Sequence, residues 1–205
     1  MLRKIATAIS KRWGSPDAKR QTWDLEYASG KWTYDRAGIN NERQEPIYSY
    51  LERYGNDGAV LDLGCGSGMT ALEMKNNFRE YTGVDVSEVA VNKARSLLSE
   101  EADRCGKVRF FAADIYSFVP DRRFSVILFR ESIYYVPQHR IKAMLQRYRA
   151  HLLDDGVFIV RLCDTNRYKG IIRIVESNFR MIEKYTPRNS SAVVLVCSDE
   201  SSDLS

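Results

Sequence analysis

The 205-residue sequence has few of the residues from which metal sites and disulfide frameworks are built. It holds only two histidines, and its four cysteines are scattered, with no CxxC spacing typical of a zinc or redox site. The cysteines are Cys65, Cys105, Cys163 and Cys197. We therefore expect reduced thiols in a cytoplasmic protein, with no metal ion.

Long hydrophobic runs are also missing, so the sequence predicts no transmembrane segment. Lys11 and Arg12 interrupt the apolar core that a signal peptide would need. Apolar residues at helical spacing predict a helix near the N-terminus, which either packs on the domain or lies on a membrane surface. The net charge of +4 is mild, and the basic residues form no concentrated stripe in the sequence. We therefore expect no nucleic-acid partner.

What the sequence does contain is a short apolar strand and a glycine turn, from Val60 to Gly68, with a helix beginning at Met69. Three glycines in five residues let the backbone turn sharply and approach a ligand that a Cβ would exclude. The first turn of the helix presents free N–H groups to that ligand. The stretch therefore predicts a ligand site at the end of this strand.

Two further strands end in an aspartate. Residues 81–84 lead into Asp85, and residues 108–112 are followed by Asp114 and Ile115. A carboxylate after the second strand supplies two acceptor oxygens for the vicinal hydroxyls of a ribose. Asp114 can accept a hydrogen bond from an adenine amino group while Ile115 packs on the ring.

Over roughly residues 45–198 the chain resembles the class I S-adenosylmethionine-dependent methyltransferases. Residues 62–68 are similar to the family's first motif, Asp85 to its ribose-binding acid and Asp114 to its adenine-contacting acid. The resemblance implies an α/β, Rossmann-like sheet of seven mostly parallel strands with an antiparallel last strand and helices on both faces. It also implies S-adenosyl-L-methionine as cofactor and S-adenosyl-L-homocysteine as product. The predicted cofactor-binding residues are Asp62, Gly64, Cys65, Gly66, Gly68, Asp85, Val86, Ala113, Asp114, Ile115 and Arg130.

Two of these residues also have purely structural explanations. Asp62 either orients the loop, meets the cofactor ammonium through water, or serves the fold alone. Cys65 lies inside the glycine loop, where a small side chain is reason enough for its presence.

The segment after the fourth strand, residues 130–137, is the expected mouth of the acceptor site, because ligands bind beyond the carboxyl ends of parallel strands. The predicted catalytic residues here are Glu131, Tyr134 and His139. Glu131 takes a proton from the acceptor, pairs with a cationic acceptor, or binds the cofactor ammonium or local backbone. Tyr134 lines the pocket or joins the core, and His139 reaches the acceptor or is a solvated residue at a helix start.

The remaining pattern predicts alternating helices and strands closed by a hairpin. Helices are expected from Asn40 or Asn41 to Tyr54, from Met69 to Phe78, over 88–101, over 138–153 and near 167–177; strands are expected over 124–129, 157–162, 179–185 and 192–197. Residues 154–156 are predicted to end the fourth of these helices.

Three parts are expected: an N-terminal helical and aromatic extension at 1–44, a methyltransferase domain at 45–198 and a disordered tail at 199–205. The stretch from Trp23 to Tyr34 is rich in aromatic residues. It either covers the cofactor as a lid or anchors a loose N-terminus.

We therefore expect a methyltransferase that modifies O or N of a small molecule. The segment from Glu131 to Val136 is similar to small-molecule methyltransferases, including those acting on sugars, and residues 27–54 loosely resemble proteins of surface-polysaccharide biosynthesis. The sequence does not determine the acceptor atom or the oligomeric state.

Three other functions are alternatives to this one. A non-catalytic S-adenosylmethionine-binding domain is the first alternative. A nicotinamide oxidoreductase is disfavoured by Met69, which stands where its fingerprint needs a third glycine. The Tyr-x-x-x-Lys motif that short-chain dehydrogenases need after the middle of the fold occurs only at Tyr27–Lys31, before the glycine loop. Base methylation is disfavoured because Glu131-Ser132-Ile133-Tyr134 is not an Asn/Asp-Pro-Pro-Tyr motif.

Overall fold

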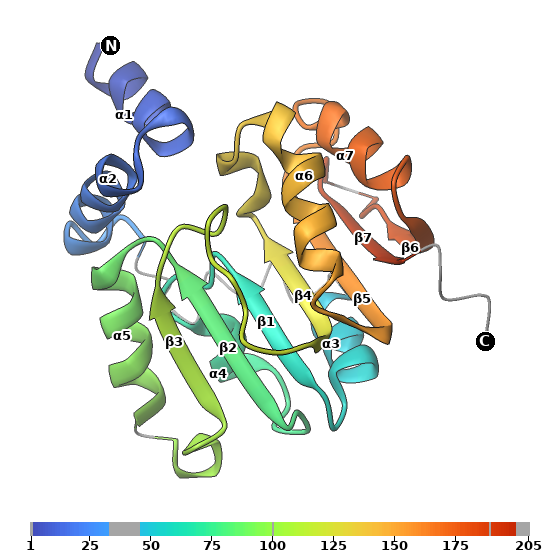
Figure 1. The fold of residues 1–205 in the computed structure, drawn as a ribbon. Helices are drawn as coiled ribbons and strands as arrows, with labels where there is room; N and C mark the ends of the chain where they lie inside the picture. The colour runs from blue at the N-terminus through green and yellow to red at the C-terminus, as the bar shows by residue number, and fades with distance from the viewer. Residues whose placement is uncertain (1, 33–45, 100, 189, 200–205) are drawn as a thin grey trace.

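The computed structural model describes residues 2–32, 46–99, 101–188 and 190–199 (Figure 1). One mixed sheet has the strand order β3-β2-β1-β4-β5-β7-β6. Strand β7 runs antiparallel to both of its neighbours, while β1 to β5 are parallel. The predicted fold class is confirmed. The strands are β1 (Ala59–Leu63), β2 (Glu80–Asp85), β3 (Val108–Ala112), β4 (Phe124–Arg130), β5 (Leu152–Leu162), β6 (Arg180–Tyr185) and β7 (Val193–Ser198).

Helices cover both faces of this sheet. One apolar cluster joins α3, α4 and α5 to one face, and a second joins α6 and α7 to the other. Strands β1 and β7 are buried along their whole length, as strands covered on both faces must be, whereas the edge strand β6 alternates. The helices are α1 (Leu2–Trp13), α2 (Pro16–Ala28), α3 (Ile47–Gly55), α4 (Met69–Glu73), α5 (Glu88–Ser99), α6 (Gln138–Arg149) and α7 (Lys169–Glu176), with 3-10 turns η2 (Ala102–Arg104) and η3 (Ile133–Tyr135).

The helix after the glycine loop is shorter than the sequence predicted. Helix α4 ends at Glu73 instead of Phe78, and Met74 is already extended. The guanidinium of Arg104 donates hydrogen bonds to the carbonyls of Ala71 and Met74. A side chain from η2 thus satisfies carbonyls that a longer helix would have paired internally.

The boundary between α6 and β5 was also predicted wrongly. Helix α6 ends at Arg149, and β5 begins at Leu152, so residues 154–156 belong to the strand. Leu152 pairs with Phe124, and the register shifts before the next pair, which marks a bulge. Pairing with β4 therefore extends the strand through residues whose composition is typical of a turn.

Two short N-terminal helices lie beside the carboxyl ends of β1 to β3 (Figure 1). The predicted helix near the N-terminus is present as α1, and α2 packs on α5. Asn40 and Asn41, the predicted helix caps, lie outside the described residues, as do Tyr34 and most of the predicted tail; the helix there begins at Ile47. Within the described ranges no helix is long and apolar enough to span a bilayer.

Candidate active site

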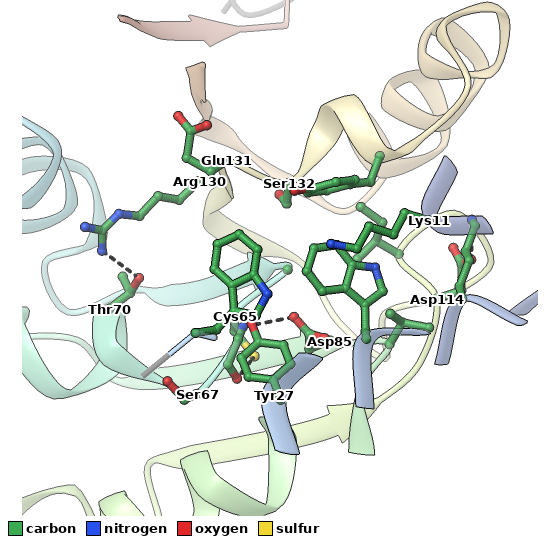
Figure 2. A pocket seen from close by; sticks show the side chains of 18 of the residues that line it. Lys11, Tyr27, Cys65, Ser67, Thr70, Asp85, Asp114, Arg130, Glu131 and Ser132 are labelled. Carbon is green, nitrogen blue, oxygen red and sulfur yellow. Dashed lines mark hydrogen bonds and ion pairs between the residues drawn. The ribbon is translucent and has the colours of Figure 1, made fainter. Parts of the chain in front are cut away.

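The glycine loop forms the floor of a pocket at the carboxyl ends of the parallel strands (Figure 2). Gly64, Gly66 and Gly68 have φ values of +90°, +54° and +81°, which side chains disfavour. A Cβ at Gly64 would lie 2.3 Å from Cβ of Ser132, and one at Gly66 would lie 2.7 Å from the hydroxyl of Tyr27. The loop therefore requires glycine for both its conformation and its close packing. Gly68 instead packs on α5 and does not line the pocket.

Asp85 ends β2 and points into this pocket (Figure 2). Its Oδ2 accepts a hydrogen bond from the Gly66 N–H at 3.0 Å, and Oδ1 accepts one from the Ser87 N–H at 2.9 Å. Burial raises the pKa of Asp85 to about 6. The carboxylate thus orders the loop and remains poorly solvated, so it would gain from further donors. Val86, the next residue, also lines the pocket.

Asp114 follows β3 and lines the same pocket beside Ile115. Its Oδ1 accepts the Tyr116 N–H at 2.7 Å, and its Oδ2 accepts the ammonium of Lys19 at 2.6 Å. Ala113 does not line the pocket; its N–H donates to the Asp85 carbonyl. Lys19, from α2, was not predicted as part of the site.

A polar end of the pocket forms around Arg130, the last residue of β4. Its guanidinium donates to the Tyr48 hydroxyl at 3.0 Å and to Oγ1 of Thr70 at 3.3 Å. The Tyr48 hydroxyl donates to Glu73 at 2.7 Å. Arg130, Thr70 and Glu73 line the pocket, which gives this end both a cation and an anion.

Glu131 lies at the pocket with an unusual backbone, φ +57°, in a non-glycine residue. Its Oε1 accepts a hydrogen bond in an ion pair with the Arg161 guanidinium, and its Oε2 accepts the Tyr134 hydroxyl at 2.7 Å. Tyr134 also lines the pocket and stacks on Tyr168 with 4.4 Å between ring centroids. Burial raises the pKa of Tyr134 well above its ordinary value. Both carboxylate oxygens are therefore engaged by protein donors.

Two other predicted residues lie away from the pocket. Asp62 is buried in β1, where it accepts the Tyr81 hydroxyl at 2.5 Å, and burial raises its pKa to about 6. His139 is exposed at the start of α6 and stacks on Trp13 with 5.7 Å between ring centroids. Neither lines the pocket. The geometry fits a structural role for Asp62 and does not place His139 at an acceptor.

Side chains from the N-terminal helices also line the pocket. Trp23 lines it and meets the ring of Tyr135 edge-on, with 4.8 Å between centroids. Asp24 accepts hydrogen bonds from the Ser87 hydroxyl at 2.6 Å and the Val89 N–H at 3.1 Å, at the start of α5. The charge of Asp24 at a helix N-terminus fastens α2 to the domain.

Several residues that line the pocket were not predicted from the sequence. Lys11 and Lys19 come from helices whose basic residues show no pattern pointing to a ligand. Thr70 and Glu73 are spaced i, i+3 directly after the glycine loop, which places both on one face of α4. That spacing could have identified them.

A parallel sheet with a glycine loop after its first strand and aspartates after the next two defines a Rossmann-like class of ligand-binding domain. Residues 60–156 match the family model described as "Methyltransferase domain". This match confirms the resemblance to the class I S-adenosylmethionine-dependent methyltransferases.

Curated proteins with similar sequences are also named as methyltransferases. The chain is 34% identical over 127 residues to trans-aconitate 2-methyltransferase of Enterobacter sp. (strain 638), covering 60% of this chain and 47% of that protein. It is 28% identical over 132 residues to N-terminal Xaa-Pro-Lys N-methyltransferase 1-B of Xenopus laevis, covering 60% and 58%. The chain thus spans about half the length of the curated relatives it matches.

Among solved structures, N-methyltransferase NodS from Bradyrhizobium japonicum WM9, in complex with S-adenosyl-L-homocysteine, has a similar fold. The TM-score is 0.75 at 17% identity, and the match covers 88% of this chain and 98% of that one. At this identity the likeness establishes the fold.

Proposed function

We propose that the protein transfers a methyl group from S-adenosylmethionine to a small acceptor, at nitrogen or oxygen. The observation that carries the proposal is the convergence of the glycine loop, Asp85, Asp114 and Arg130 on one pocket. A glycine loop alone suits many nucleotides. A loop joined to an acid after each of the next two strands and a cation after the fourth suits a ligand with a ribose, an adenine and an amino-acid part.

The residues present fit that ligand part by part. Gly64 and Gly66 pack closely against Ser132 and Tyr27 and line the pocket, so the loop can present backbone N–H groups to a ligand there. Asp85 would accept both ribose hydroxyls. Val86 and Ile115 would pack on the adenine, and the Arg130 guanidinium would bind the methionine carboxylate.

For the reaction, the protein has chiefly to bind, align and exclude water. The bound cofactor would supply an activated methyl group on a sulfonium, with the neutral thioether as leaving group. An acceptor that arrives protonated must also lose that proton. Glu131 already accepts donors from Arg161 and Tyr134. It therefore suits positioning of the pocket wall better than direct proton transfer.

The identity of the acceptor remains a prediction. The expectation of a sugar or surface-polysaccharide precursor rests on loose resemblance alone. The names of several similar proteins specify N-methylation, including the Xenopus laevis relative and (S)-coclaurine N-methyltransferase of Papaver somniferum. These names support an amine among the candidate acceptors.

Calorimetry with S-adenosylmethionine, S-adenosylhomocysteine and NAD tests the cofactor. Binding of either sulfur ligand, with weaker or no binding of NAD, is expected; tighter binding of NAD would overturn the proposal. Transfer of labelled methyl to a panel of amines, hydroxy acids and nucleotide sugars then tests catalysis. Cofactor binding without transfer to any small, nucleic-acid or protein acceptor would favour the non-catalytic alternative.

A further inference from the structure

An aromatic cage encloses the ammonium of Lys11 inside the pocket. Its Nζ lies 3.7 Å from the ring centroid of Trp23, 5.5 Å from that of Trp32 and 5.9 Å from that of Tyr135. All four residues line the pocket, and Figure 2 shows the Lys11 side chain extending across it. Several aromatic faces around one ammonium are the arrangement that recognises alkylammonium ligands.

A carboxylate completes the cage. Glu26 accepts the Lys11 ammonium at 2.5 Å, the Trp32 indole N–H at 2.7 Å and the Lys31 ammonium at 2.8 Å. Burial opposes its ionisation, but the hydrogen bonds from Lys11, Lys31 and Trp32 outweigh this effect and lower the pKa of Glu26 to about 2. The cage therefore keeps a fixed negative charge at any physiological pH, and it favours a cation.

Lys11 reaches this position from the last turn of α1 on a flexible four-carbon side chain. Only 10% of its side chain is exposed, and burial, partly offset by the bond to Glu26, lowers the pKa of its ammonium. A lysine on a flexible stem can leave such a place when another cation enters. We propose that Lys11 is an internal stand-in for the acceptor, and that the cage of Trp23, Trp32, Tyr135 and Glu26 binds an ammonium group of that acceptor.

The proposal rests on the proposed function and narrows it to acceptors that carry an ammonium group. That group positions the acceptor, while the methyl group goes to a neutral nitrogen or oxygen, because an ammonium has no lone pair. The same pocket contains the glycine loop, Asp85 and Glu131, so a cation held in the cage would lie beside the cofactor. Lys11 then competes with the acceptor. Removing its charge should end that competition for Glu26 and the aromatic faces, and so strengthen the binding of a foreign ammonium.

Choline is a suitable probe, because 3,3-dimethylbutan-1-ol has the same shape without the charge. Two of the three tryptophans, Trp23 and Trp32, belong to the cage, so indole fluorescence reports its occupation. We expect Lys11→Met to bind choline at least tenfold more tightly than the native chain, and the alcohol to show no such gain. Lys31→Met is the matched control, because Lys31 bonds the same carboxylate but is 57% exposed, and its choline affinity should stay near the native value.

Choline titrations with and without S-adenosylhomocysteine separate the cage proposal from the proposed methyltransferase function. If that ligand fails to bind by calorimetry, the proposed function fails while the choline result still judges the cage. Lys11→Gln serves as a second variant should Lys11→Met not fold, and Trp23→Leu in the Lys11→Met background should abolish the gain. The cage proposal is overturned if neither Lys11 variant gains affinity for choline, or if choline and the alcohol bind equally well.

Discussion

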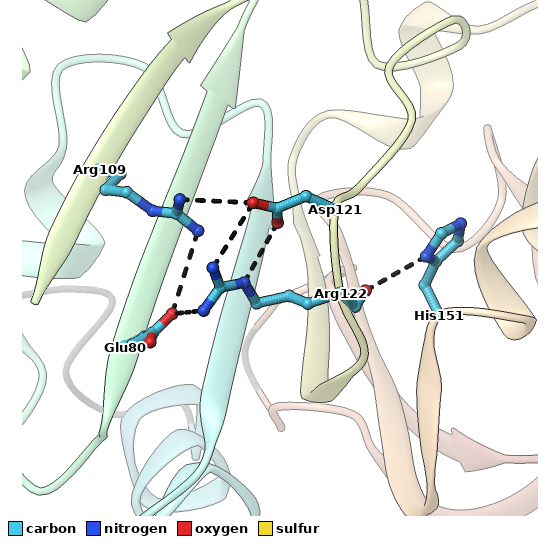
Figure 3. Close-up of polar contacts among 5 residues, drawn as sticks. All are labelled: Glu80, Arg109, Asp121, Arg122 and His151. Carbon is cyan, nitrogen blue, oxygen red and sulfur yellow. Dashed lines mark hydrogen bonds and ion pairs between the residues drawn. The ribbon is translucent and has the colours of Figure 1, made fainter.

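The same parallel strands carry charged residues at both ends, and the two ends use them differently. At the carboxyl ends, Asp85 and Asp114 lie buried under the N-terminal helices and bond backbone N–H groups and Lys19. At the amino ends, charged residues form an exposed network with one another (Figure 3). Its members are Glu80 in β2, Arg109 in β3, and Asp121 and Arg122 just before β4.

The difference between the two ends is one of solvation. In the exposed network Arg122 bonds Glu80 and lies 3.1 Å from Asp121, whose side chain is 58% exposed. Water and salt screen such pairs. The side chains of Lys19 and Asp114 are only 12% and 6% exposed, so each depends on its partner. We therefore expect charge changes to be costly at the carboxyl ends and mild at the amino ends.

The largest expected effect is the breaking of the buried pair. Asp114→Asn keeps an acceptor for the Tyr116 N–H but leaves the Lys19 ammonium unpaired, which should lower the free energy of unfolding by about 3 kcal/mol. Urea denaturation of the chain without ligand measures this. Adding Lys19→Met should restore much of the loss. If the free energy of unfolding of Asp114→Asn alone stayed within about 1 kcal/mol of the native value, the Lys19 ammonium would be solvated by water instead of depending on Asp114.

The second effect concerns ligand binding. Asp85→Ala should weaken the binding of S-adenosylhomocysteine by about 2–3 kcal/mol, because two ribose hydroxyls would lose a charged acceptor. The domain should still fold. Calorimetry measures the affinity, and Asp85→Asn, which can still accept one N–H of the loop, separates ribose binding from loop order. Unchanged affinity in both folded variants would remove Asp85 from the site.

A smaller effect is expected from pH. Burial raises the pKa of Asp85 to about 6, and the ribose hydroxyls would donate to its charged form. Affinity for S-adenosylhomocysteine should therefore fall as pH falls through 6, by about tenfold or 1.4 kcal/mol between pH 7 and pH 5. Asp85→Asn should flatten this profile. Asp62, with a similarly raised pKa, is the control: Asp62→Asn should leave the profile in place.

Apart from the start of β5, the sequence predicted the strands and the glycine turn well, because glycine turns and buried strands are local patterns. Gly64 to Gly66, Asp85 and Asp114 follow directly from strand ends. Lys19 could not be predicted, because its partner Asp114 is 95 residues away and the pairing depends on how α2 sits on the domain. Packing also decides whether a helix start faces a pocket, and here His139 stacks on Trp13 away from the pocket lining.

The smallest effect should come from the exposed network. Contact with Arg122 holds the pKa of Asp121 below its ordinary value, but screening by water limits what that contact is worth. Asp121→Asn should change the free energy of unfolding by about 0.5 kcal/mol or less, and the difference should vanish in about 1 M salt, where the Debye length is about 3 Å. The loss from Asp114→Asn should persist in the same salt, because solvent reaches that pair poorly. If both losses disappeared together, burial by the N-terminal helices would not be what separates the two ends of the sheet.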